Sequence, residues 1–186
     1  PVVAVMRGLE RLALRRARGV IAVSDGVAER VRALGVPAER VTVVPNGIDT
    51  GVFTADGDAA AAVHTFVYTG TMSEWQGAEV FVRAMPAVRE KYPDARLEFV
   101  GQGASEPELR RLAGQIAPDA VSFGGVVPPA DAARRLRGAV GALVSIVPGR
   151  GYDFAKPTKI YAATACGTPV LFAGTGDSAA MIRDND

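Results

Sequence analysis

The chain has 186 residues and a formal net charge of +1, with 48% hydrophobic and 22% charged residues. This composition can form a packed core and excludes a disordered chain, and the near-zero charge argues against a general nucleic-acid-binding protein. One histidine (His64) and one cysteine (Cys166) are too few for a structural zinc site, a disulfide framework or a Cys/His catalytic pair.

Seven short runs rich in strand-forming residues predict β-strands, and helical patterns lie between most of them. The runs are apolar throughout rather than alternating, which favours a parallel sheet covered by helices on both faces. The predicted fold class is therefore α/β. In chain order, the predicted strands are residues 19–23, 41–44, 65–69, 96–100, 121–123, 141–145 and 169–172.

Apolar residues at helical spacing predict the connecting helices. Ser24 or Asp25 opens the first of these helices, and Ser105 with Glu108 three residues later predicts a capping box at another. Two further helices are expected at residues 129–137 and 157–166. The predicted buried stripes are Val27, Val31 and Leu34, then Val80, Phe81, Ala84 and Val88, then Leu109, Leu112 and Ile116.

One segment, TGVFTADGDAAAA, interrupts the alternation because it has neither a helical nor a strand period. We therefore expect a short α/β piece at residues 1–50, a linker at 51–62 and a fuller α/β domain at 63–186. The chain begins with Pro1 rather than Met, and its last residues resemble a helix just begun. We expect both ends to be cut.

No stretch is long and apolar enough to cross a bilayer, because the longest uncharged run, residues 160–176, is interrupted by glycines such as Gly167 and Gly174 and by Pro169. With a single cysteine and no visible signal peptide, this predicts a cytoplasmic protein. The helix around residues 7–18 has two interpretations. Its arginines form a solvated surface, or they face a membrane, which would place the protein at the inner membrane face.

The segment YTGTMSEWQG predicts a strand that ends in a turn at Gly70, with a helix beginning near Trp75. Ligands of open parallel sheets bind at the carboxyl ends of strands, and helix N-termini offer unpaired N–H groups to anions. Gly70 would let a phosphate approach the backbone. An ordinary turn that requires glycine is the alternative.

A second glycine pair, Gly101 and Gly103, lacks the third glycine of a dinucleotide fingerprint, since Glu106 stands in its place. No P-loop pattern occurs in the sequence. We interpret this pair as a turn at a sheet edge that can line a ligand crevice.

A short helix entered from a polar loop is predicted near the end of the chain. Pro157 suits its first turn, Gly167 suits the position after its last residue, and Pro169 prevents its continuation. Its N-terminus combines N–H groups with Lys156 and Lys159, a favourable site for a diphosphate. Two surface lysines on a capped helix are the alternative.

Five segments carry a recognisable pattern over nearly the whole chain. They are VTVVPNGID (41–49), FVYTGTMSEWQGAE (66–79), ARLEFVGQG (95–103), VSFGGVVP (121–128) and KPTKIYAATACGTPVLFAG (156–174). In this order they resemble the bacterial GT-B retaining glycosyltransferases of family 4, the glycosyl transferases group 1. The last two resemble the branch that acts in capsule and O-antigen synthesis.

This resemblance implies two Rossmann-like domains, each a parallel sheet with helices on both faces. Residues 1–50 would be the last β/α units of the acceptor domain, and residues 63–186 most of the domain that binds the nucleotide-sugar donor. The catalytic groups of the acceptor side would lie outside this chain. We therefore name no catalytic residue and expect the isolated fragment to be inactive.

The sequence departs from the family pattern at charged positions. Thr71 and Gln76 stand where many members have cations on the pyrophosphate, and Phe154 and Ala162 replace two family glutamates, the second of which holds the donor ribose. By resemblance to the capsule branch, the lysines near Pro157 would restore the positive charge. The implied diphosphate site is Gly70, Thr71, Gln76, Gly77, Lys156, Pro157, Thr158 and Lys159, and the implied base and ribose site is Gly101, Gly103, Gly125, Val126 and Asp177.

The leading hypothesis is a hexosyltransferase-type enzyme that moves a sugar from a nucleotide-diphosphate donor to a sugar, lipid-linked or small-molecule acceptor. The resemblance implies retention of configuration, no metal, and no cofactor besides the nucleotide-sugar co-substrate. Peripheral membrane contact would come from the acceptor domain, and no nucleic acid is expected as a partner. The alternatives are a non-catalytic nucleotide-sugar binding module and a scaffold whose cleft is blocked by Trp75 or Tyr152.

Overall fold

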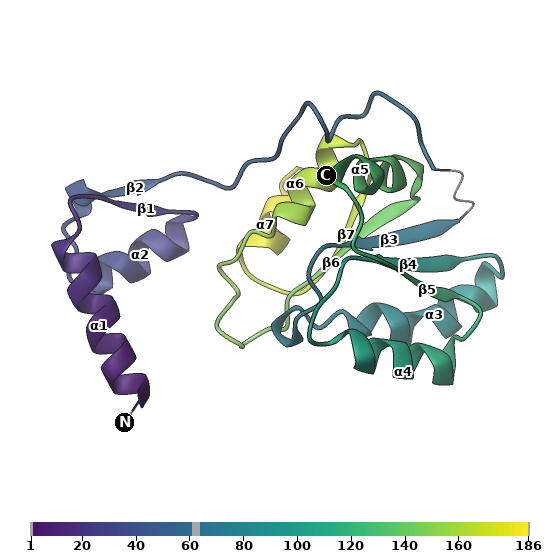
Figure 1. Ribbon diagram of the computed structural model, residues 1–186, viewed down its shortest axis with the longest axis horizontal. Coiled ribbons are helices and arrows are strands. Elements are labelled where there is room, and N and C mark those ends of the chain that lie inside the picture. The colour runs from purple at the N-terminus through teal and green to yellow at the C-terminus, as the bar shows by residue number, and fades with distance from the viewer. Residues whose placement is uncertain (1, 61–63, 186) are drawn as a thin grey trace. The chain divides into compact units, whose positions relative to one another are not determined.

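The computed structural model describes residues 2–60 and 64–185, which fold into two compact units, Pro1–Asn46 and Gly47–Asp186. Each unit has its own buried core. Figure 1 shows the ribbon of both units. None of the helices in the described ranges has the length and apolar character needed to span a membrane.

The amino-terminal unit is a small α/β piece. Its strands β1 and β2 pair in parallel, with Val20 beside Val41. Ser24 caps the second helix, because its hydroxyl accepts a hydrogen bond from the Val27 N–H at 3.3 Å, as the sequence predicts. The elements are α1 (Val2–Arg16), β1 (Val20–Ala22), α2 (Asp25–Ala33), η1 (Ala38–Arg40) and β2 (Val41–Val43).

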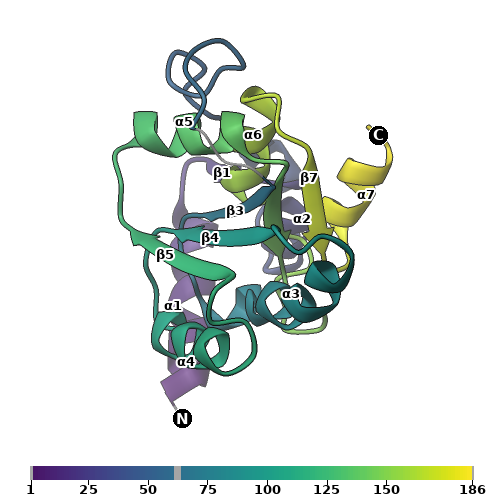
Figure 2. The same cartoon turned by 90° about the vertical axis from the view of Figure 1, so that its right-hand side faces the viewer.

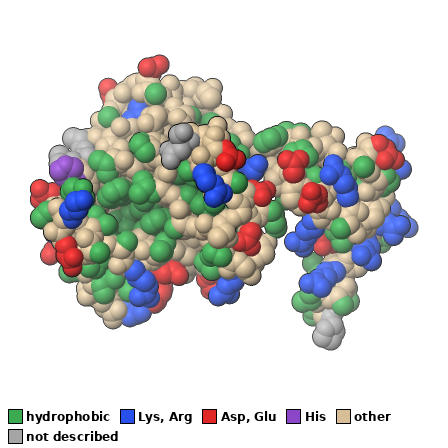
Figure 3. Space-filling view, turned by 180° about the vertical axis from the view of Figure 1, so that it is seen from behind, with side chains coloured by type: hydrophobic (Ala, Val, Ile, Leu, Met, Phe, Trp, Pro, Cys, Tyr) green, Lys and Arg blue, Asp and Glu red, His purple; other side chains and the backbone are tan. Residues whose placement is uncertain are grey.

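Helix α1 contributes no buried residue to this unit. Val2, Val5, Met6 and Leu9 are all more than half exposed. Figure 3 shows such hydrophobic side chains beside those of Lys and Arg on the surface of this unit. Both interpretations of this basic helix therefore stay predictions.

The carboxyl-terminal unit is built on a five-stranded parallel sheet with the strand order β5-β4-β3-β6-β7. All seven strands predicted for the chain are present, and their bounds differ from the prediction by at most two residues. The sheet strands are β3 (Thr65–Thr69), β4 (Arg96–Val100), β5 (Val121–Gly125), β6 (Gly141–Ser145) and β7 (Val170–Ala173).

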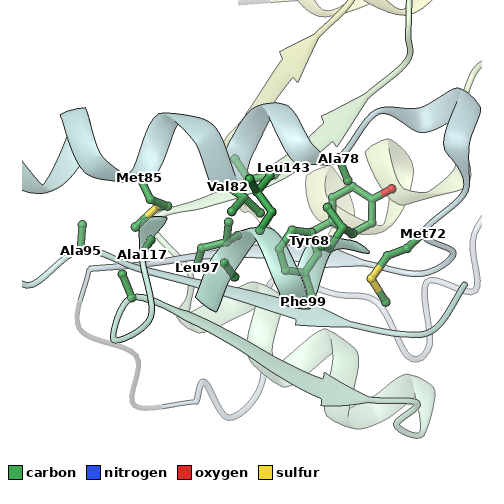
Figure 4. Close-up of a cluster of buried hydrophobic side chains, with 14 residues drawn as sticks. Tyr68, Met72, Ala78, Val82, Met85, Ala95, Leu97, Phe99, Ala117 and Leu143 are labelled. Atoms are coloured by element: carbon green, nitrogen blue, oxygen red, sulfur yellow. The ribbon is translucent and has the colours of Figure 1, made fainter. Parts of the chain in front are cut away.

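Helices cover both faces of this sheet, as Figures 1 and 2 show. One face carries α3 (Glu79–Lys91) and α4 (Glu106–Ile116) over a core that includes Tyr68, Leu97 and Phe99 (Figure 4). The other carries α5 (Pro129–Gly138) and α6 (Thr158–Ala165) over a second core. Helix α7 (Asp177–Arg183) packs beside β7. The predicted α/β class with a doubly covered parallel sheet is confirmed.

The predicted buried face of α3 is confirmed only in part, because Phe81 and Val88 pack against the core but the other two predicted residues do not. Val80 and Ala84 are exposed, whereas Val82 and Met85 are buried in the core. This helix carries apolar residues at two overlapping helical spacings. Packing against the sheet selects a face that includes Val82 and Met85, and the chain enters this helix through a 3-10 turn and the left-handed Gly77. On α4, Ile116 of the predicted stripe is likewise 38% exposed.

The predicted capping box at Ser105 does not form. Ser105 has helical backbone angles and makes no side-chain cap hydrogen bond. Its N–H instead donates to the carbonyl of Met72 at 3.0 Å, and Glu108 pairs with Arg111 on the helix surface. A contact distant in sequence therefore replaces the local cap.

The segment before β3 packs on the second core although it contains neither a helix nor a strand. Ile48 and Phe53 lie against that core, and the guanidinium of Arg137 donates to the carbonyls of Thr54 and Asp58 at 3.1 and 2.8 Å. This segment overlaps the predicted linker at 51–62, of which residues 61 and 62 lie outside the described residues. The linker and domain limits stay predictions.

Helix α6 ends as the sequence predicts, at a left-handed Gly167 with φ of 71°. The N–H of Thr168 returns to the carbonyl of Ala163 at 2.9 Å, which satisfies the end of the helix. The buried Thr168 hydroxyl donates to the carbonyl of Leu136 at 2.7 Å and so joins this turn to α5.

Replacing Thr168 with valine should lower the free energy of unfolding by about 1 kcal/mol, because the buried hydrogen bond to Leu136 is lost at nearly constant volume. Thr164→Val is the matched control, since the Thr164 hydroxyl bonds only within its own helix at an exposed position. Urea denaturation measures both variants. Equal destabilisation by the two would contradict the prediction.

Candidate functional site

The strand order places a natural binding position between β3 and β6. These two strands are neighbours, yet the chain continues from β3 to β4 on one side and from β6 to β7 on the other. Ligands of open α/β sheets bind at the carboxyl ends of strands where the order reverses in this way. The connections that leave β3 and β6 there contain the eight residues predicted to bind diphosphate.

Lys159 is the residue that joins these two connections. It lies in the first turn of α6, and its Nζ is 3.8 Å from the centroid of the Tyr68 ring and 3.4 Å from the carbonyl oxygen of Thr71. A Cβ added to Gly70 would lie 3.9 Å from Lys159 Cε. The structure thus brings together Gly70, Thr71 and Lys159, while Tyr68 is a residue that sequence reasoning missed.

The charge of Lys159 is not neutralised within the described residues. The ion pairs found there join Arg110 to Glu106, Arg111 to Glu108 and Arg135 to Glu98. Burial away from water lowers the pKa of Lys159 to about 7. The positive end of the α6 dipole also disfavours a cation in the first turn.

Tyr68 is a neutral donor beside this lysine. Burial raises the pKa of Tyr68, so its phenol keeps its proton at neutral pH, and the hydroxyl donates to Thr71 O at 3.0 Å. A lysine with an aromatic face, a helix N-terminus and no carboxylate partner is suited to bind an anion.

The loops that follow β3, β4 and β5 are joined by backbone hydrogen bonds. The Gly70 N–H donates to Val100 O at 2.7 Å, and the Gly101 N–H donates to Gly125 O at 2.7 Å. A Cβ at Gly101 would overlap the Gly70 carbonyl, and one at Gly103 would overlap the backbone of Met72. The two glycines predicted for base and ribose binding therefore permit this close approach, and their contact with a ligand stays a prediction.

Gln76 lies inside the turn after β3, which includes η2 (Glu74–Gln76). Its side chain is 4% exposed, and its Oε1 accepts a hydrogen bond from the Ser73 N–H at 3.1 Å. Gln76 therefore stabilises the turn, a role that the sequence comparison with the family did not suggest. Gly77, also predicted to bind diphosphate, ends the turn with φ of 61°.

The loop that leads into α6 is tied to the start of α7. Asp153 accepts hydrogen bonds from the Thr175 hydroxyl at 3.0 Å and, through its carbonyl, from the Asp177 N–H at 3.1 Å. The Ser178 hydroxyl donates to Ala155 O at 2.7 Å. Asp177 is thereby placed beside the loop that contains Lys156, Pro157 and Thr158.

Two aromatic rings join this loop to the turn after β3. Trp75 and Tyr152 stack with ring centroids 4.6 Å apart, and the Val147 N–H donates to the carbonyl of Trp75 at 2.9 Å. The scaffold hypothesis proposes that Trp75 or Tyr152 blocks a cleft, and in the structure these two rings pack on each other.

The remaining predicted residues lie at the carboxyl end of β5. Gly125 has φ of 67°, and Val126 is 67% exposed, so both are open to a ligand. A surface hollow at the neighbouring end of β4 is lined by Gln102, Gly103, Glu106, Pro107 and Arg110. Within residues 2–60 and 64–185, no cluster of three or more His, Cys, Asp or Glu side chains is placed to hold a metal ion.

Comparison with known families and relatives agrees with this geometry. Residues 63–186 match the family described as glycosyl transferases group 1, and residues 1–52 match glycosyltransferase family 4. A D-inositol 3-phosphate glycosyltransferase of Acidothermus cellulolyticus is 30% identical over 82% of this chain and 37% of its own length. A GDP-mannose-dependent alpha-(1-6)-phosphatidylinositol monomannoside mannosyltransferase of Mycolicibacterium smegmatis is 28% identical over 96% and 51%.

Solved structures agree on the fold. Anabaena Alr3699/HepE, crystallised with UDP-glucose, superposes with a TM-score of 0.74 at 18% identity, over 94% of this chain and 50% of the other. The resemblance inferred from the five sequence segments is thereby confirmed. The chain spans 37 to 51% of the length of the two relatives described above.

Gly101→Ala should lower the free energy of unfolding by about 3 kcal/mol, because a methyl group at φ of 135° is strained and overlaps the Gly70 carbonyl. Gly114→Ala is the control. It lies on the exposed surface of α4 with open space around its Cβ position, and alanine there should stabilise the helix by about 0.5 kcal/mol. Thermal denaturation that shows no difference between the variants would contradict the close approach of the loops.

Proposed function

Because this chain belongs to the glycosyl transferases group 1 family, we propose that it acts in the transfer of a sugar from a nucleotide-diphosphate sugar to an acceptor. The observation that supports this most directly is the ammonium of Lys159, which has no carboxylate partner in the described ranges and lies where the strand order reverses. In this proposal residues 63–186 belong to the donor domain and residues 1–50 to the acceptor domain.

The diphosphate of the donor binds between the loop after β3 and the start of α6. Lys159 supplies the charge, and the first N–H groups of α6 and the Thr71 hydroxyl supply hydrogen bonds. As the bond between sugar and diphosphate breaks, the leaving nucleotide gains negative charge, which these groups stabilise. This supply of positive charge supports a transfer without a metal ion, and the family supports retention of configuration.

The base and ribose of the donor lie toward the ends of β4 and β5. Val126 offers an exposed apolar surface beside the left-handed Gly125. Asp177 follows β7, at the opposite edge of the sheet from β5, so its carboxylate is offered to a hydroxyl of another part of the donor. The names of the two relatives favour acceptors built on inositol, free or lipid-linked. Lipid-linked acceptors would bring the whole protein to a membrane surface.

A nucleotide-sugar binding module without catalysis is the second candidate. Thr71 and Gln76 carry no charge, and Ala162, which replaces a family glutamate, is 6% exposed and belongs to the second core. A full-length protein that binds nucleotide sugar but neither transfers nor hydrolyses it would favour this candidate over the enzyme.

Lys159→Met should weaken the binding of a nucleoside diphosphate about tenfold to a hundredfold, because a charge-assisted contact to phosphate is lost. Lys91→Met is the matched control, since Lys91 lies at the exposed end of α3. Titration calorimetry with UDP, GDP and ADP measures all three proteins. Equal binding by both variants, or no binding of any nucleotide by the parent chain, would contradict the proposed site.

A further inference from the structure

We propose that Tyr68 is the positioning residue of the diphosphate site: its ring holds the ammonium of Lys159, its hydroxyl holds the carbonyl of Thr71, and the diphosphate binds to the protonated lysine. This inference rests on the proposed function because it concerns the same site. It adds Tyr68 to the residues of that site and makes the protonation of Lys159 a condition for binding.

The position of Tyr68 is set by the core rather than by the site. Tyr68 lies in β3 and is completely buried, and its ring packs on that of Phe99 with a centroid distance of 5.3 Å (Figure 4). The Phe81 ring is the second neighbour, with a centroid distance of 6.4 Å. Only the ring face toward Lys159 and the hydroxyl toward Thr71 are directed at the predicted diphosphate residues. A rigid ring of this kind can fix the lysine before a ligand arrives.

The Thr71 carbonyl is the second group that Tyr68 controls. Its oxygen accepts hydrogen bonds from the Tyr68 hydroxyl at 3.0 Å and from Lys159 Nζ at 3.4 Å. A carbonyl oxygen turned toward a phosphate would repel it. Because the Tyr68 residue is fully buried, its hydroxyl holds this oxygen toward the protein interior and so keeps the negative end of the dipole away from a bound anion.

The charge of the lysine follows from the groups around it. On the elements next to Lys159, the titratable side chains are Tyr68, Glu74, Arg150, Tyr152, Asp153, Lys156 and Tyr161. Of these, only Tyr68 contacts the ammonium in the described part of the chain. With a pKa near 7, Lys159 is largely neutral at pH 9 before ligand binds. If the diphosphate binds only the ammonium form, Lys159 must take up a proton on binding. The affinity of the chain for the diphosphate therefore falls as pH rises.

The test is the pH dependence of nucleoside diphosphate binding by the chain between pH 7.5 and 9.0, above the range in which the phosphate itself titrates. Calorimetry with UDP and GDP in two buffers of different ionisation enthalpy counts the protons taken up. The parent chain should bind with proton uptake and lose about 25-fold in affinity across this range, as its protonated fraction falls. Lys159→Arg keeps its charge and should bind without uptake.

Three substitutions separate the role of Tyr68 from a general effect on folding. Tyr68→Phe keeps the ring and should retain proton uptake, with a loss of affinity of a few fold from the freed Thr71 carbonyl. Tyr68→Leu removes the ring and should weaken binding at every pH. Phe123→Leu is the control, because it removes a ring that packs on the same core through Phe99 rather than through Tyr68, and it should keep the parent pH profile.

A second measurement uses no nucleotide. The folded pKa of Lys159 lies below its usual value of 10.5, so between pH 7 and pH 10 the unfolded chain binds more protons than the folded chain. The contribution of Lys159 to the free energy of unfolding therefore rises with pH in this window. The Lys159→Met variant lacks this contribution.

The outcomes separate the two proposals. If the parent chain shows this pH-dependent stability but binds no nucleotide, the proposed function fails. If nucleotide binds, but Tyr68→Leu retains the affinity and pH profile of the parent, only the role of Tyr68 fails.

Discussion

The contact between the Lys159 ammonium and the Tyr68 ring is the interaction on which the candidate site depends. It links α6 to β3, and the Thr71 carbonyl that accepts the lysine's hydrogen bond lies 88 residues before Lys159 in the chain. None of the ion pairs of the described residues gives this lysine a carboxylate partner. The sheet order makes this contact geometrically natural, because β3 and β6 are neighbours and α6 follows β6. A cation held in this way is prepared for an anionic ligand.

The surrounding backbone makes the site rigid. Main-chain hydrogen bonds join the loops after β3, β4 and β5. At Gly101 and Gly103 two backbone segments lie so close that a Cβ atom would overlap the neighbouring segment. The loop before α6 is tied to the start of α7 through Asp153 and Ser178. Since these contacts hold each loop from more than one side, a ligand would meet groups already in place.

Sequence patterns succeeded where a local signal was unambiguous. Apolar runs bounded by glycine or proline located every predicted strand, and Gly167 located the end of α6. They failed where two local solutions competed. The face of α3 was decided by packing, and the expected cap at Ser105 was replaced by a hydrogen bond to Met72, which is distant in sequence. The diphosphate contact of Gln76 stays a prediction, and the structure adds that the oxygen of this side chain closes its own turn.

By itself, the sequence determined the α/β class, the strands, the family and the chain positions of Gly70, Thr71 and Lys159, because periodicity, turn residues and motif order are local properties. Only the tertiary structure decided that Tyr68 lies under the ammonium of Lys159 and that Gln76 is buried. Both depend on which strands become neighbours and which loops pack together. Such contacts join residues far apart in the chain, and no spacing within a single segment encodes them.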